Sequence, residues 1–189
     1  MFVNPLTQQE LGNALNTLNN ETEDTLRLVF NTFNSHSNIN GVIAKIAILD
    51  RLYSTNLKLL GIDIVDFAKK ISNIKNIDYR LSVGDVSLVE EIVKVSNGKK
   101  PFVFATKYCC LHNYLIYKKD DYSIVDSHVK KELPKYANAV QIGGNKITES
   151  YLNKLQQNNN YQGIHNIIGD VLNKNNVSGR RAFDRLMWL

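Results

Sequence analysis

The sequence predicts an all-α protein, a bundle of about eight to ten short helices in one domain that covers residues 1–189. Apolar residues recur at intervals of three and four along most of the chain, a spacing typical of helices that bury one face. No alternation of polar and apolar residues is long enough to predict a sheet. A content of 43% hydrophobic and 22% charged residues is typical of a globular protein with a real core.

Caps and apolar stripes mark the helices of the first half. Thr7 and Glu10 have the spacing of a capping box, in which the two residues satisfy each other's backbone N–H groups. A polar loop is expected over residues 34–40, and Asp63 is expected to cap a helix that runs to Ile71. The helices expected in this half begin near residues 7, 22, 41 and 63.

Turn residues divide the second half. Ser96-Asn97-Gly98 predicts a turn, and Pro101 suits the first turn of the helix that follows. Residues 114–123 are expected to form a connection, in which 114–117 could be a short strand. Pro134 is expected to end its helix because proline lacks the N–H that a helix interior requires. The helices expected in this half cover residues 85–95, 101–111, 126–134, 148–157, 161–173 and 178–189.

Several classes of protein are disfavoured by composition. No run of about 18 apolar residues occurs, so no membrane helix is expected, and the N-terminus lacks the pattern of a secretion signal. Cys109 and Cys110 are adjacent, which predicts core packing rather than a structural disulfide. No His or Cys spacing predicts a zinc site. We therefore expect a cytoplasmic protein, monomeric, with no metal and no organic cofactor.

The net charge of +5 and the pI of about 9.1 permit a polyanionic partner such as nucleic acid. They do not require one, because many basic proteins bind no nucleic acid. The net positive charge therefore supports nucleic-acid binding but is not sufficient to predict it.

A lysine and an aspartate flank one predicted connection. Lys107 lies on an apolar helix, and Asp126 follows 19 residues later at the start of the next helix. A lysine in a dry pocket can act as a nucleophile, and a carboxylate can stabilise positive charge on a sugar as its base departs. Two structural interpretations stay open: Asp126 could serve only as a helix cap, and Lys107 could extend its amine to the surface or pair with Asp126.

The segment IVDSHVKKEL, residues 124–133, resembles the helix-hairpin-helix DNA glycosylases, the superfamily of endonuclease III and 8-oxoguanine glycosylase. The resemblance covers residues 103–131. It implies a two-lobed all-α fold with a cleft near residues 96–131, and base excision from DNA on a flipped base. By resemblance, Asp126 is the catalytic aspartate and Lys107 the Schiff-base lysine of the members that also cleave the strand.

One departure concerns the hairpin. The family has Gly-hydrophobic-Gly just before the lysine, where backbone N–H groups approach a phosphate. This sequence has Val103-Phe104-Ala105 instead. Either residues 97–100 form the hairpin turn instead, or the backbone site that binds a phosphate is missing.

The candidate DNA contacts are polar turns and basic residues around this cleft. Each has a simpler structural interpretation as a helix end, a solvated charge or a partner of a nearby acid. The candidates are Ser54, Thr55, Asn56, Gly98, Lys99, Lys100, His128, Lys130, Lys131, Arg180 and Arg181.

Three hypotheses on function follow. The first is a DNA glycosylase for DNA repair, with lyase activity if Lys107 reaches the site. The second is a DNA-binding module that keeps the fold without the chemistry, which the missing hairpin glycines favour. The third is a helical partner-binding component of a defence or toxin system.

Overall fold

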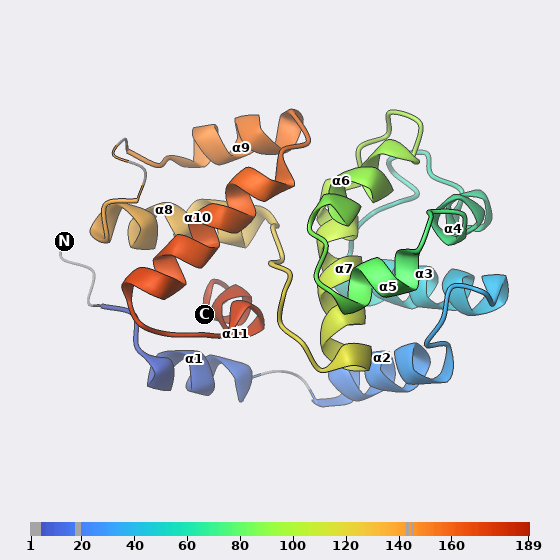
Figure 1. Ribbon diagram of the computed structural model, residues 1–189, viewed down its shortest axis with the longest axis horizontal. Coiled ribbons are helices and arrows are strands. Elements are labelled where there is room, and N and C mark those ends of the chain that lie inside the picture. The colour runs from blue at the N-terminus through green and yellow to red at the C-terminus, as the bar shows by residue number, and fades with distance from the viewer. Residues whose placement is uncertain (1–4, 18–19, 143, 145) are drawn as a thin grey trace. The chain divides into compact units, whose positions relative to one another are not determined.

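The computed structural model describes residues 5–17, 20–142, 144 and 146–189. These residues form eleven α-helices and no strand (Figure 1). The predicted all-α class is therefore confirmed. Within the described residues, no helix combines the length and the apolar character that crossing a membrane would require.

The chain divides into two compact units. Unit 1 comprises Met1–Leu18 and Tyr122–Leu189, and unit 2 comprises Asn19–Asp121. Unit 1 is thus built from two separate stretches of chain, and unit 2 is the stretch between them.

Unit 2 is assembled around one apolar helix. Its helices are α2 (Asn20–Thr32), α3 (Ile39–Tyr53), α4 (Ile64–Ser72), α5 (Ile77–Ser82), α6 (Ser87–Lys94) and α7 (Phe102–Tyr117). Helix α7 packs against α2, α3, α5 and α6, and most of its residues are buried. A helix that is apolar on nearly all sides belongs at the centre of its unit, because every face needs a covering neighbour.

Unit 1 contains α1 (Gln8–Leu15), α8 (Ser127–Ala139), α9 (Glu149–Gln157), α10 (Tyr161–Lys174) and α11 (Arg180–Leu186). Helix α10 packs against α8, α9 and α11. Helix α1 lies beside α11, as Figure 1 shows in blue and red, although the two come from opposite ends of the sequence.

Three predicted caps are confirmed. Thr7 and Glu10 form the complete capping box of α1. The Asp63 side chain accepts the N–H of Asp66 at 2.8 Å at the start of α4. Asp126 caps α8. Polar side chains at these positions satisfy backbone N–H groups that the helix leaves without partners. Residues of this kind before an apolar stripe therefore identify the start of a helix from sequence alone.

The prediction of eight to ten helices misses α5. This six-residue helix begins after Asn76, which has a left-handed backbone (φ 56°) and makes no side-chain cap hydrogen bond. Its sequence therefore lacks a start signal, and its two buried residues, Ile77 and Leu81, are too few to reveal a periodic stripe.

The prediction of a connection or strand over residues 114–117 is wrong, because α7 continues to Tyr117. Leu111 and Leu115 are both fully buried on one stripe of the helix. The side-chain amide of Asn113 donates to the carbonyl of Leu81 at 2.8 Å, which fixes this turn against α5. The helix ends only at Lys118, whose backbone is left-handed.

The prediction that Pro134 ends its helix is also wrong. Helix α8 continues through Pro134 to Ala139. Val129, Leu133 and Ala137 lie four residues apart and are fully buried, so the burial of this stripe holds the helix together across the missing N–H.

Candidate functional site

Asp126 is a buried carboxylate at the start of a helix. The residue is 4% exposed, and its Oδ1 accepts the backbone N–H groups of His128 at 3.0 Å and Val129 at 3.1 Å. The partial positive charge at a helix N-terminus favours an anion at this position. The structure therefore holds the Asp126 carboxylate in a fixed orientation within unit 1.

Lys107 is a buried amine in the second turn of α7. The residue is 3% exposed, and its Nζ lies 4.9 Å from the centroid of the Tyr53 ring. The face of an aromatic ring attracts a cation, so Tyr53 at the end of α3 helps to accommodate the amine inside unit 2. Lys107 is therefore not a lysine that extends to the surface.

Lys107 and Asp126 belong to different units of the chain. Each is almost completely buried, Lys107 on the central helix of unit 2 and Asp126 at the start of α8. The predicted pairing of the two residues, and the predicted cleft near residues 96–131, stay predictions.

The predicted hairpin turn lies between α6 and α7. Asn97, Gly98 and Lys100 all have left-handed backbones, with φ of 56°, 81° and 52°. Gly98 is exposed, and a Cβ added to it would meet no atom within 4 Å. The turn therefore presents backbone and two exposed lysines, Lys99 and Lys100, to solvent.

The turn after α3 contains Ser54, Thr55 and Asn56. Ser54 is the left-handed C-cap of α3, and the hydroxyl of Thr55 donates to Asp50 at 2.5 Å. Ser54 and Asn56 are exposed. The interpretation as a helix C-terminus is confirmed, and a DNA contact stays a prediction.

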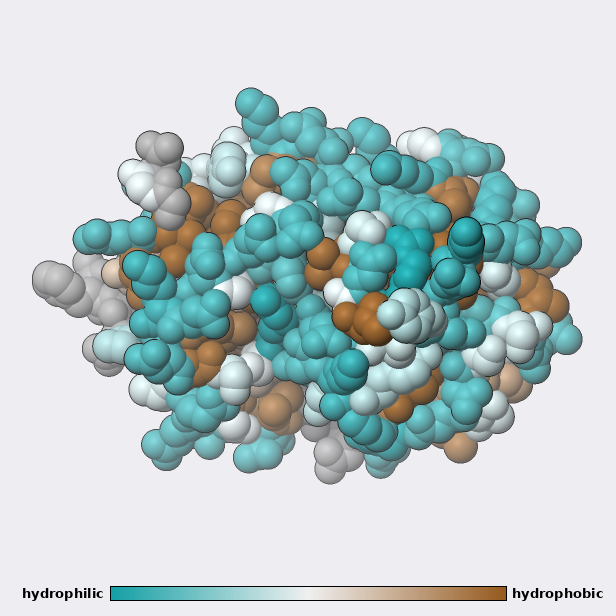
Figure 2. Space-filling model, viewed as in Figure 1, coloured by the Kyte–Doolittle hydropathy of each residue, from teal (hydrophilic) through white to brown (hydrophobic). Residues whose placement is uncertain are grey.

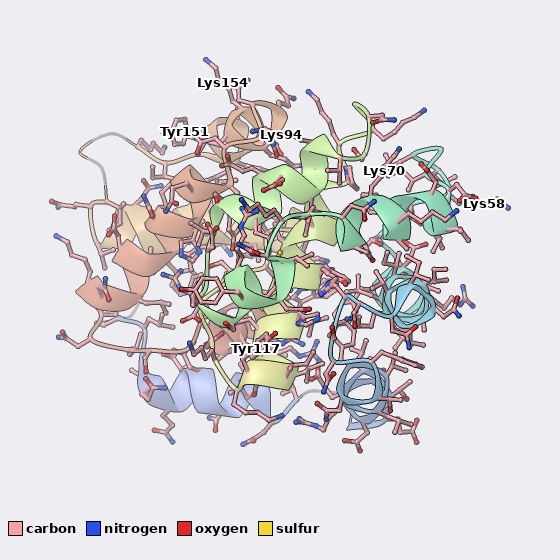
Figure 3. The ribbon with its side chains drawn as sticks, turned by 45° about the vertical axis from the view of Figure 1, so that its right-hand side comes forward. Lys58, Lys70, Lys94, Tyr117, Tyr151 and Lys154 are labelled. Carbon is pink, nitrogen blue, oxygen red and sulfur yellow. The ribbon has the colours of Figure 1, made fainter. Side chains whose placement is uncertain are left out.

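These two turns of unit 2 lie side by side. A Cβ added to Gly61, at the end of the turn that follows α3, would lie 3.2 Å from the amine of Lys99. The amine of Lys99, a predicted DNA contact, thus lies beside the end of the turn that follows α3. Figure 3 shows further lysines, among them Lys58 and Lys70, at the outside of this unit.

Three candidates lie on α8. The amine of Lys130 donates to Asn153 at 2.8 Å and to Gln156 at 2.6 Å, which links α8 to α9. Lys131 is exposed. His128 is exposed and stacks on Trp188, with ring centroids 3.9 Å apart. Of the three, Lys130 has a structural role, and Lys131 and His128 are accessible to a ligand.

The two arginines of α11 point inward within unit 1. Arg181 is 2% exposed and pairs with Asp184 at 2.6 Å, which agrees with the simpler interpretation of this arginine as a partner of a nearby acid. Arg180 donates from Nη1 to the hydroxyl of Ser123 at 2.9 Å and to the carbonyl of His165 at 3.2 Å. Both side chains therefore serve the packing of unit 1.

A polar cluster in unit 2 was not predicted. Asp78 accepts the Nδ1–H of His36 at 2.5 Å, so Nε2 of His36 accepts the hydroxyl of Tyr108 at 2.7 Å. Nearby, the amine of Lys45 lies 3.0 Å from Nε2 of His112. These residues are spread over α3, α5, α7 and the loop before α3, so no spacing in the sequence reveals them.

Burial sets the charge states of this cluster. Burial lowers the pKa of His36, and it lowers that of His112 well below the usual value, helped by the positive charge of Lys45. Burial also lowers the pKa of Lys45 to about 8. For Asp78, burial acts to raise the pKa, but the hydrogen bonds from His36 outweigh this effect and lower it to about 2.

His36, Asp78 and His112 could in principle hold a metal ion, since one donor atom from each lies within 4.8 Å of the others. The rings of His36 and His112 are stacked, however, with centroids 4.9 Å apart and planes at 25°. Lone pairs in nearly parallel planes do not converge on one ion, and the Lys45 amine repels a cation. We assign hydrogen bonding to this cluster rather than metal ligation.

Hydrophilic side chains cover most of the face shown in Figure 2, with separate apolar patches between them.

The two cysteines lie in the interior of unit 2. Cys109 and Cys110 are buried on α7 and form no disulfide, which confirms their predicted role in core packing.

Comparison with known proteins gives a family and one relative. Residues 7–121 match the sequence model of HI_0787_N, a family described as an N-terminal domain. An uncharacterized protein from Haemophilus influenzae (strain ATCC 51907 / DSM 11121 / KW20 / Rd) is 32% identical over 154 residues. The match covers 80% of this chain and 66% of the relative, just under two thirds of that protein's length. No solved structure matches the chain.

Proposed function

The chain belongs to the HI_0787_N family, and we propose that it acts on DNA by base excision, as a glycosylase with a lyase step. One observation carries the proposal: a buried lysine on the central helix of unit 2 precedes, by 19 residues, a buried aspartate fixed at a helix start. The proposal includes a two-lobed fold similar to that of the helix-hairpin-helix glycosylases.

Asp126 would stabilise the positive charge that develops on the sugar as the base departs. A carboxylate already held by two backbone N–H groups needs no reorganisation when that charge appears, which makes its electrostatic effect large. Burial strengthens the effect because little water competes.

Lys107 would supply the nucleophile. Its neutral amine attacks C1′ of the sugar, the glycosidic bond breaks, and the base leaves with the bonding electrons and takes up a proton. One proton of the amine goes to the departing base, and the other goes to O4′ as the C1′–O4′ bond breaks and the ring opens, which leaves a Schiff base between Nζ and C1′. The proposed reaction uses no cofactor.

DNA is the proposed partner. The two adjoining turns of unit 2 offer exposed backbone together with Lys99 and Lys100, and lysines of this kind contact phosphates without reading sequence. His128 and Lys131 offer a second pair of accessible groups on unit 1.

Borohydride trapping tests the nucleophile. With duplexes that carry damaged bases or abasic sites, the wild type should form a covalent adduct, and Lys107→Met should form none. Lys45→Met is the matched control, because Lys45 is the other buried lysine of unit 2 and should not be needed for trapping. An adduct that persists in Lys107→Met would reject the role of Lys107.

Base release tests the carboxylate. Asp126→Asn removes the charge but keeps a good cap, since Asn and Asp are about equally favourable at the N-cap. We expect loss of base release with an unchanged helix content. Asp63→Asn, at an exposed cap with the same type of hydrogen bond, should leave base release intact. Equal activity of Asp126→Asn and wild type would refute the proposal.

A second candidate function is DNA binding without chemistry. Phe104 and Ala105, at positions where the resembling family has its hairpin glycine motif, are 1% and 0% exposed, so their backbone is covered. A phosphate would then bind only at the turn over residues 97–100, one turn before the helix. Salt-sensitive DNA binding with no released base and no adduct would favour this candidate.

A further inference from the structure

The segment that leads into Asp126 is buried and lies outside the helices. Tyr122, Ser123, Ile124 and Val125 are at most 1% exposed, and none of them belongs to a helix. Buried backbone groups outside regular structure need individual partners, because an unsatisfied N–H or C=O is costly. The partners of Ser123 therefore help to hold this segment in place.

One hydroxyl provides both partners. The backbone N–H of Ser123 donates to the Tyr161 hydroxyl at 2.7 Å, and the same hydroxyl donates to the carbonyl of Ser123 at 2.9 Å. The N–H and C=O of Ser123 therefore point to the same side, as they do in a strand that pairs with a neighbour. The Tyr161 hydroxyl thus takes the place of a partner strand.

The side chain of Ser123 is held as well. Arg180 donates to its hydroxyl at 2.9 Å, and the hydroxyl lies 3.2 Å from Nδ1 of His165. Burial, and then the charge of Arg180, lower the pKa of His165 to about 3, so Nδ1 of the neutral ring can accept the hydroxyl proton. Groups from α10 and α11 therefore fix Ser123 on both its backbone and its side chain.

Tyr161 is itself immobile. It is the first residue of α10 and is fully buried. Ser123 lies three residues before Asp126, and the two residues between them, Ile124 and Val125, are packed in the core. A displacement of Ser123 would therefore be passed along a short, stiff segment to the carboxylate.

We propose that Tyr161 is a positioning residue for the Asp126 carboxylate, acting through the backbone of Ser123. The inference rests on the proposed function of Asp126. Without the hydroxyl, the N–H and C=O of Ser123 lose their partner, and the segment shifts toward water. The carboxylate then no longer meets the sugar in the geometry that the reaction requires.

The test separates chemistry from binding. For Tyr161→Phe, the single-turnover rate of base release at saturating DNA should fall about 100-fold, as expected for a misplacement of about 1 Å. The Kd for DNA should stay the same. Tyr151→Phe is the control, since Tyr151 points outward from unit 1 and is 45% exposed (Figure 3), and it should change neither quantity.

A second measurement needs no DNA. The amide ¹⁵N–¹H signals of His128 and Val129 report on Asp126, because both groups donate to its Oδ1. They should shift in Tyr161→Phe and not in Tyr151→Phe. If Tyr161→Phe fails to fold, Ser123→Ala, which removes only the contacts to Arg180 and His165, should show the same pattern with a smaller loss of rate.

The outcomes are distinguishable. Shifted amides with a slower reaction and an unchanged Kd support the inference. Unchanged amides and an unchanged rate, with Asp126→Asn inactive, overturn the inference and leave the proposed function standing. If Asp126→Asn is fully active, the proposed function is wrong, and the role of Tyr161 in positioning Asp126 for catalysis is wrong with it.

Discussion

The carboxylate of Asp126 is buried, and a buried charge is costly unless hydrogen bonds replace its water. Two N–H groups at the start of α8 provide that replacement. The sequence predicts the cap, because Asp before a helical stripe is a local signal. It does not predict the support of Ser123 by Tyr161, because that contact joins residues 38 positions apart.

Three of the four histidines are buried, and this makes stability depend on pH. Burial lowers the pKa of His36, His112 and His165 below the ordinary 6.5. Below pH 6.5 the unfolded chain therefore binds protons that the folded chain does not, and the free energy of unfolding falls as the pH falls. The carboxylate of Asp78, with its pKa near 2, contributes only at lower pH.

His112→Gln should flatten this dependence. Between pH 6 and pH 5, the slope of unfolding free energy against pH should decrease by about 1.4 kcal/mol per pH unit, the contribution of one proton. Urea unfolding at several pH values measures the slope. An identical slope in His112→Gln would show that this histidine is not held neutral.

At the scale of helices, capping residues predict where a helix starts, whereas burial in the folded unit determines how far it continues. Capping residues correctly predicted the starts of α1, α4 and α8, because a cap depends on neighbours in sequence. The course of α7 to Tyr117 was missed, since it depends on burial against α5 that only the folded unit provides. Helix α8 is the clearest case, since its packing overrides a proline.

Pro134→Ala should stabilise the chain. A proline inside a helix lowers the free energy of unfolding by about 3 kcal/mol. It offsets up to about 1 kcal/mol of this loss because it restricts the conformations of the unfolded chain. We therefore expect the free energy of unfolding to rise by about 2 kcal/mol, measured by urea denaturation. Pro101→Ala, at the start of α7, is the control and should bring no comparable gain, because no N–H is missing there from a helix interior. No gain in Pro134→Ala would mean that α8 is already bent to suit the proline.

At the scale of the whole molecule, helical periodicity predicts the fold class but not which segments make up each unit. Helical periodicity is sufficient for an all-α assignment. The division into unit 1 and unit 2 depends on the packing of α1 against α11. A contact between residues near the two ends of the sequence is not predicted by any local sequence pattern. The cluster of His36, Asp78 and His112 could not be predicted for the same reason, because its residues are far apart in the sequence.

DNA binding should depend on salt through the turn between α6 and α7. If Lys99 and Lys100 each contact a phosphate, replacing both with Gln should reduce the slope of log K against log salt by roughly 2. Fluorescence anisotropy with a labelled duplex measures this slope. The control replaces Lys146 and Lys174, two exposed lysines of unit 1 outside the predicted contacts. Equal slopes for both double variants would place the DNA elsewhere.

The contact between α1 and α11 also bears on the order in which the chain folds as it is made. Unit 2 has all its helices once residue 121 has left the ribosome, and it can fold at that point. Helix α1 emerges earlier, yet its buried Leu11 and Ala14 must wait for a helix synthesised some 170 residues later. From that point until α11 has been made, the nascent chain thus carries an exposed apolar segment ahead of a folded unit. That segment is where a chaperone would be expected to bind.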